Sequence, residues 1–240
     1  MKAILPGLLF LVFAHGCANA PVSDKTAQAA YEAMESHLLS AGVLRVNYEV
    51  EARGAVAAKL AGDLVMQKPA LAAINASGVF AGAEVAPVFV SDGTGTRGGV
   101  GPEFFEHDIP TDLREGVLIG LMRMGILHNL AVLTQNMPPE GTDGGVREWL
   151  VVNGFGWQSS TRKSGTRELR GISFVIEVGG EPAGDVVIWY DPESGLPVER
   201  EQVVHFDNGD MHVSERYVVE TEGIVGPCRF DLDAVGSTAN

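Results

Sequence analysis

The stretch HFDNGDMH, residues 205–212, contains two histidines and two aspartates. Imidazole and carboxylate groups are ligands of Zn²⁺ and Ni²⁺, so metal-dependent hydrolysis through His205 and His212 is one hypothesis. Asn208-Gly209 is typical of a two-residue hairpin turn. This interpretation places His205 directly opposite His212, with both side chains on the solvent-exposed face of the hairpin.

A solvent-facing hairpin end lacks the partly dry cavity and the supporting shell that a catalytic metal needs. We therefore interpret the stretch as a polar hairpin end with no metal. His37, His107 and His128 are expected to be structural. The chain has no HExxH, GxSxG, CxxC or lysine-containing phosphate loop. None of these catalytic or phosphate-binding motifs occurs, and no cofactor is expected.

Hydrophobic periodicity predicts the elements that carry these residues. Helical spacing begins near Ser23 or Asp24 and ends before Gly42. Alternation of apolar and polar residues over 44–52 is typical of a half-buried antiparallel strand. Residues 98–112 are expected to be a loop. Further strands are predicted at 60–67, 71–76, 88–90, 146–152, 169–178, 185–190, 198–206 and 211–220.

A longer helix is predicted over residues 111–133, and it is apolar on most of its circumference. Such a helix is usually buried between other layers of a fold. A membrane span is not expected here, because Arg123, His128 and Asn129 interrupt the apolar run.

The N-terminus indicates export. Met1-Lys2 precedes the apolar run ILPGLLFLVFA (residues 4–14), so residues 1–20 are predicted to be a signal peptide. Two processing routes remain open. Either Cys17 ends a lipobox and is lipidated, or cleavage follows Ala20. Cys228 then has no intramolecular partner. The net charge of -14 argues against nucleic-acid binding.

Three short motifs occur in a suggestive order: GDLVMQKP (62–69), VSDG (90–93) and WYDPESGLP (189–197). Together with the signal peptide, the first helix and the late strand meander, they resemble the LolA-like superfamily. That family comprises periplasmic lipoprotein carriers, their outer-membrane receptor relatives and outer-membrane lipoprotein-sorting proteins. The resemblance spans residues 24–222, which we treat as one domain, with residues 223–240 as a C-terminal tail.

The resemblance implies an α+β, mainly β fold. Its strongly curved antiparallel sheet is an unclosed half-barrel, and helices plug the concave face. It also implies a cavity that binds lipid or the acyl chains of a lipoprotein in the periplasm or at the outer membrane. The alternative is an envelope interaction or sensor module with a filled cavity, which recognises a partner protein. The candidate cavity residues are Leu44, Val46, Tyr48, Val50, Leu118, Leu121, Met122, Met124, Ile172, Phe174, Ile176 and Val178.

Overall fold

The computed structural model describes residues 23–134 and 146–235. The strands of the described residues are β1 (Val43–Gly54), β2 (Ala58–Gln67), β3 (Leu71–Phe80), β4 (Ala83–Val85), β5 (Pro87–Asp92), β6 (Thr96–Val100), β7 (Glu103–His107), β8 (Leu150–Trp157), β9 (Arg162–Ser164), β10 (Arg167–Val178), β11 (Glu181–Asp191), β12 (Leu196–Val204) and β13 (Met211–Glu220). The helices are α1 (Lys25–Ser40), α2 (Leu113–Met124), α3 (Ile126–Thr134), α4 (Val146–Trp149) and the 3₁₀ helix η1 (Pro227–Phe230).

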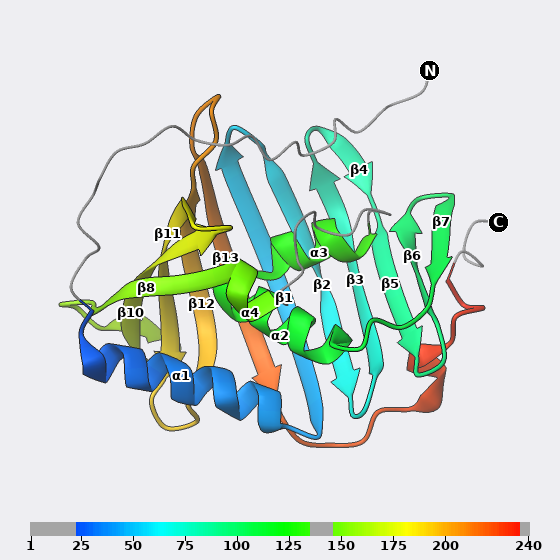
Figure 1. Ribbon diagram of the computed structural model, residues 1–240, viewed down its shortest axis with the longest axis horizontal. Helices are drawn as coiled ribbons and strands as arrows, with labels where there is room; N and C mark the ends of the chain where they lie inside the picture. Colours follow the sequence, from blue (N-terminus) through cyan, green and yellow to red (C-terminus); the bar gives the residue numbers. More distant parts are fainter. Residues whose placement is uncertain (1–22, 135–145, 236–240) are drawn as a thin grey trace.

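The strands form one antiparallel sheet in the order β7-β6-β5-β3-β2-β1-β13-β12-β11-β10-β8, with β4 paired to β3 and β9 paired to β10. The first strand of the chain therefore pairs with the last, and Tyr48 lies opposite Tyr217. The alternation in β1 buries Leu44, Val46 and Val50 on one face. Within the described residues β7 and β8 are not paired with each other, so the sheet is unclosed (Figure 1).

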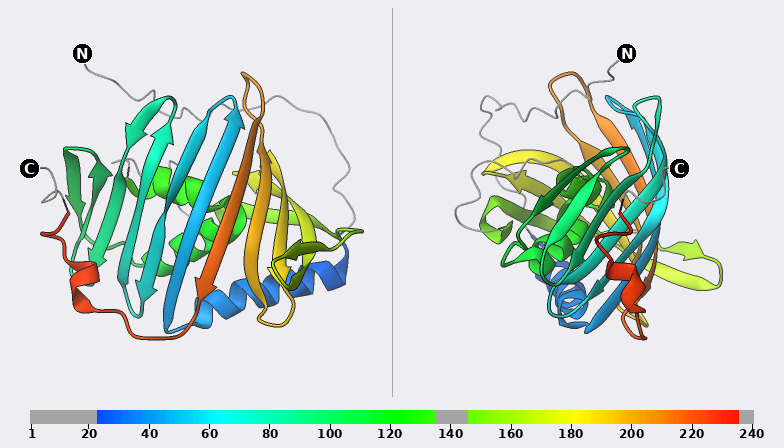
Figure 2. Two further views of the ribbon diagram at one scale, coloured as in Figure 1. Left: turned by 180° about the vertical axis from the view of Figure 1, so that it is seen from behind. Right: turned by 90° about the vertical axis from the view of Figure 1, so that its right-hand side faces the viewer.

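Seen from the side, the sheet is an arc with the helices on its concave face (Figure 2). Helix α1 begins at Asp24, whose carboxylate accepts hydrogen bonds from the N–H groups of Thr26 and Ala27. The helix buries Tyr31 against Phe174 of β10, with ring centroids 4.9 Å apart. Helices α2 and α3 lie over the middle of the concave face (Figure 1). None of the helices among the described residues is both long enough and apolar enough to span a membrane.

The predicted fold class is confirmed, since the unclosed, mainly β half-barrel carries its helices on the concave face. Three local predictions are wrong. The single helix over 111–133 is two helices, because Gly125 has φ +88° and ends α2. The loop over 98–112 contains most of β6 and all of β7, a hairpin turned at Gly101 with φ +68°. The strand expected at 146–152 instead begins as the short helix α4.

The C-terminal segment lies against the convex face. Phe230 and Val235 are buried against Val65, Ala73 and Val90, in a small hydrophobic cluster separate from the main core. An ion pair between Arg229 and Asp63 joins the same segment to β2. Residues 223–235 therefore cover an outward-facing apolar patch of β2, β3 and β5.

Candidate functional site

The candidate cavity residues come together in the main hydrophobic core between the sheet and α2. All but one are buried in this cluster, and Val178 is half-buried at its margin. Their role as ligand contacts stays a prediction, as does lipidation of Cys17, which lies outside the described residues. The concave face is thus lined with apolar side chains, and α2 and α3 pack directly on it.

Helices α2 and α3 form one compact hairpin, which we call the cover (residues 113–134). The side-chain amide of Asn129 on α3 donates a 2.8 Å hydrogen bond to the backbone carbonyl of Val117 on α2. The helices approach closely at Gly120, where an added Cβ would lie 2.2 Å from Oδ1 of Asn129. A glycine is required there, so the two helices are built to stay together.

The bend of the cover lies on a buried carboxylate. Glu215 of β13 accepts 3.1 Å hydrogen bonds from the N–H groups of Ile126 and Leu127, the first residues of α3. A negative charge at a helix N-terminus is favourable, because the unpaired N–H groups and the helix dipole point towards it. A Cβ at Gly125 would lie 2.6 Å from this carboxylate, so only glycine allows the approach.

A buried arginine contacts the other side of the bend. Arg200 of β12 is 1% exposed and lies directly across from Glu215 in the β12–β13 pairing. Its guanidinium donates to the carbonyls of Met122, at 2.8 Å, and Arg123, at 2.6 Å. These are C-terminal carbonyls of α2, which a cation stabilises. Arg200 and Glu215 thus hold opposite helix ends at one point, residues 122–127, which we call the junction.

Two neighbouring side chains complete the hydrogen bonding of the junction. Gln202 accepts a 3.1 Å hydrogen bond from Arg200. The hydroxyl of Tyr217 donates to Glu215. Burial raises the pKa of Tyr217 well above its usual value, and the negative charge of Glu215 adds to this effect, so the hydroxyl keeps its proton.

An ionic cluster fixes the junction to α1. Arg123 donates to both carboxylate oxygens of Glu35, at 3.0 and 3.2 Å, and to the carbonyl of Leu150. Arg147 of α4 joins the same carboxylate at 3.1 Å and also pairs with Glu115 of α2. Glu35 is 6% exposed, so its charge is buried together with the guanidinium groups that balance it.

The first turn of α2 is held differently. One nitrogen of Arg114, Nη2, donates a 2.6 Å hydrogen bond to the carbonyl of Ala41. Its Nε and Nη1 are buried and have no acceptor among the described residues. Beside it, the Nζ of Lys68 donates a 2.8 Å hydrogen bond to the carbonyl of Ser40. Burial lowers the pKa of Arg114. Two cations therefore bond consecutive carbonyls at the C-terminal end of α1.

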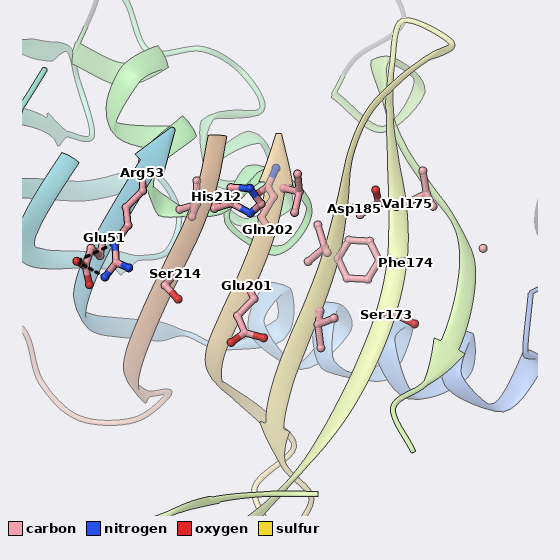
Figure 3. A pocket seen from close by; sticks show the side chains of 15 residues that line it. Glu51, Arg53, Ser173, Phe174, Val175, Asp185, Glu201, Gln202, His212 and Ser214 are labelled. Carbon is pink, nitrogen blue, oxygen red and sulfur yellow. Dashed lines mark hydrogen bonds and ion pairs between the residues drawn. The ribbon is translucent and has the colours of Figure 1, made fainter. Parts of the chain in front are cut away.

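Two hollows lie on the convex face. The larger has a volume of about 670 Å³, and Figure 3 shows it over β1 and β10–β13, with the outward side chains of Glu51, Ser173, Glu201 and Ser214. The second, of about 590 Å³, lies between the C-terminal segment and β1–β2. Neither is the apolar concave cavity that the resemblance implies, because both are open and partly polar.

The histidine stretch differs from its predicted register. Strand β12 ends at Val204 and β13 begins at Met211, and His212 lies opposite Val203, so the prediction that His205 faces His212 is wrong. A six-residue loop replaces the expected two-residue turn. His205 instead bonds Asp210 at 2.9 Å and Asp185 at 3.2 Å, one through each ring nitrogen.

The hydrogen bond to Asp210 raises the pKa of His205, and the one to Asp185 adds to the effect. A protonated imidazole has no lone pair for a metal. In the described part of the chain, no group of three or more histidine, cysteine, aspartate or glutamate residues is placed to hold a metal ion.

No family model and no curated protein matches the sequence. Solved structures are similar in fold. Lipoprotein LppX of Mycobacterium tuberculosis is 11% identical, with a TM-score of 0.46 over 85% of this chain and 99% of that chain. LprF of Mycobacterium bovis is 12% identical, with a TM-score of 0.43 over 87% and 100%. A LolA superfamily protein of Nitrosomonas europaea is 8% identical, with a TM-score of 0.35 over 87% and 98%.

Proposed function

We propose that this chain is a non-catalytic protein of the cell envelope that binds a hydrophobic ligand on the concave face of its sheet. The ligand is lipid or the acyl chains of a lipoprotein. The cover is displaced when the ligand binds, and the candidate cavity residues then contact the acyl chains. The N-terminal signal in the sequence supports export to the periplasm or the outer membrane.

The observation that carries this proposal is the uneven attachment of the cover. Its bonds to β12 and β13 converge on the junction, through Arg200 and Glu215. Along the rest of their length, α2 and α3 contact the sheet mainly through apolar side chains such as Leu118, Leu121 and Leu130. Apolar contacts are non-directional, so acyl chains can replace them with little loss.

The methionines of α2 fit the same role. Met122 and Met124 belong to the cover itself and are buried in the main core cluster. A methionine side chain is flexible and polarizable, and it adapts to apolar surfaces of different shape. Such a lining suits acyl chains of varied length better than a rigid aromatic wall does.

The first test is the composition of the exported protein, purified from a bacterial periplasm without detergent. Native mass spectrometry, followed by solvent extraction, should find phospholipid or acylated peptide at near-stoichiometric amounts. A mass equal to that of the polypeptide alone, together with no binding of added fatty acid, would refute the proposal.

A second test follows the rate of ligand uptake. Glu215→Gln weakens the bond between the junction and β13, so a fluorescent fatty acid should bind faster than it does to the unchanged protein. Glu49→Gln is the matched control, because Glu49 is exposed on β1 and, within the described part of the chain, its one ion pair is with Arg216, at 3.6 Å. Equal uptake rates in all three proteins would show that the junction does not limit displacement of the cover.

A second candidate function is recognition of a partner protein with the concave face permanently filled. The tight packing of the core under the cover favours it, as does the position of the two hollows on the convex face. This function predicts no extracted lipid. It also predicts that Ser214→Arg, in the larger hollow, weakens partner binding, while Glu215→Gln has no effect on it.

A further inference from the structure

Arg114 has fewer hydrogen-bond partners than the other arginines around the cover. Arg123 has the carboxylate of Glu35, and Arg147 has those of Glu35 and Glu115. The guanidinium of Arg200 donates to backbone carbonyls and to Gln202. Arg114 has a single carbonyl, and two of its nitrogens are buried without an acceptor among the described residues.

Such a group requires an explanation, because an N–H group that is buried without an acceptor loses its hydrogen bonds to water and gains none in return. The chain has 31 acidic residues against 17 basic ones, so carboxylates are abundant. The nearest ones along the chain do not serve Arg114. Glu115 pairs with Arg147, and Asp112 makes no hydrogen bond to cap the helix.

The position of Arg114 links it to the proposed ligand site. It belongs to the first turn of the cover, and its neighbours Leu113 and Val117 are in the core cluster that faces the sheet. Lys68, at the turn between β2 and β3, bonds the carbonyl of Ser40, and Arg114 bonds the next carbonyl along the chain, that of Ala41. A positive site thus lies at the margin of the apolar concave face.

We propose that Arg114 and Lys68 bind a phosphate group, the anionic head of an acyl ligand whose chains lie under the cover. This inference rests on the proposed function and names the ligand class: phosphate-bearing lipids. Among the described residues Arg114 has only one hydrogen bond, so the first turn of α2 can lift and turn Nε and Nη1 towards the phosphate. The planar guanidinium then donates two parallel hydrogen bonds to phosphate oxygens, and the ammonium of Lys68 adds a third.

The test compares two ligands that differ by the phosphate alone. Lysophosphatidic acid and the monoacylglycerol with the same acyl chain are titrated calorimetrically into the mature exported protein. The unchanged protein should bind the phosphorylated ligand about tenfold more tightly or better. Arg114→Met should abolish that preference and leave the affinity for monoacylglycerol unchanged. Arg216→Met, which removes an exposed charge from the convex face, should keep the preference.

Inorganic phosphate is the second probe, and the unfolding temperature is its readout. It distinguishes a lipid headgroup from a free anion and separates this inference from the proposed function. Stabilisation of the unchanged protein but not of Arg114→Met, without binding of either acyl ligand, would keep the anion site and refute the proposed function. Equal affinity for both acyl ligands would refute the phosphate site while the proposed function stands. Binding of neither the acyl ligands nor phosphate would refute both.

Discussion

The two ends of α2 are attached to the protein in opposite ways. At the junction, each buried charge has its full set of partners: Arg200 caps the end of α2, Glu215 caps the start of α3, and Arg123 pairs with Glu35. At the first turn, Arg114 has one hydrogen bond and two buried nitrogens without an acceptor among the described residues. An arginine therefore belongs to a complete network of hydrogen bonds at one end of α2 and to an incomplete one at the other end.

This difference indicates which end of α2 is held in place by its contacts and which end can move. A satisfied buried network is costly to disturb, because each partner left behind becomes an unpaired polar group. An incomplete network is improved by a ligand that supplies the missing acceptor. We therefore expect the junction to behave as the fixed point of the cover and the first turn of α2 as its mobile end. The following variants test this contrast, starting with the largest expected effect.

Replacing the arginine of the junction should be the most damaging change. Arg200→Met leaves the carbonyls of Met122 and Arg123 without their donor, and it leaves the Glu215 carboxylate buried without the neighbouring cation. We expect the free energy of unfolding in urea to fall by about 3–5 kcal/mol. Arg216→Met, on the adjacent strand but exposed, should change it by less than about 0.5 kcal/mol. If the free energy of unfolding of Arg200→Met fell by less than about 1 kcal/mol, the junction would not be the fixed point of the cover.

A backbone variant tests the same point without changing charge. Gly125→Ala forces an alanine into φ +88° and brings its Cβ to 2.6 Å from the Glu215 carboxylate. The unfavourable backbone and the displaced carboxylate together should cost about 2–3 kcal/mol, measured by thermal unfolding. Gly116→Ala is the matched control within α2, because nothing lies within 4 Å of its added Cβ. That variant should gain about 0.5–1 kcal/mol from helix propensity.

The pH dependence of stability should report on α3. Burial lowers the pKa of His128 from 6.5 to about 4, and the positive charge of Arg200 contributes. The unfolded chain therefore takes up a proton below pH 6.5 that the folded protein does not bind, so stability falls between pH 6.5 and 4, by about 3 kcal/mol. His128→Gln should flatten this part of the curve of stability against pH, which is measured by urea unfolding at each pH.

His205 serves as a control, because its pKa is shifted in the opposite direction from that of His128. Its hydrogen bonds to Asp210 and Asp185 raise its pKa. The stability that it contributes is fully present below pH 6.5 and is lost as pH rises through the raised pKa. His205→Gln should therefore lower stability at acidic pH and leave it unchanged at alkaline pH. An identical response of both variants would show that neither histidine senses its surroundings as described.

The half-barrel was predicted from the resemblance carried by the three short motifs, whereas the regular patterns of the strands predicted much of the sheet itself. The uninterrupted alternation over residues 44–52 and 172–178 indicated which side chains face the core, and the structure buries all of them except Val178, which is half-buried. Strand β6 was missed, because TRGGV lacks alternation and owes its pairing to the strands beside it. In place of the expected tight turn at Asn208-Gly209 the structure has a wider loop. This difference also comes from contacts with residues that are distant in the sequence. His205 is held by Asp185, twenty residues away, which no local pattern reveals.

One feature of the sequence indicates the junction, namely a glutamate at a buried position of a strand. In β13 the buried positions are Met211, Val213, Glu215 and Tyr217, so period two places a glutamate among core residues. A charged residue at such a position needs a partner. Its partners, the N–H groups of Ile126 and Leu127, lie 88 to 89 residues away. Strand periodicity identifies the buried charge, and only the tertiary fold identifies what it binds.

The smallest expected effect belongs to the other arginine of the comparison. Arg114→Met removes one hydrogen bond to Ala41, and it also removes two buried nitrogens that have no acceptor among the described residues. These changes oppose each other, so the free energy of unfolding of the ligand-free protein should change by less than about 0.5 kcal/mol. Urea unfolding of Arg114→Met beside Arg200→Met is the direct measurement. A loss of several kcal/mol at Arg114 would mean that the first turn is as firmly specified as the junction, and the cover would then have no mobile end.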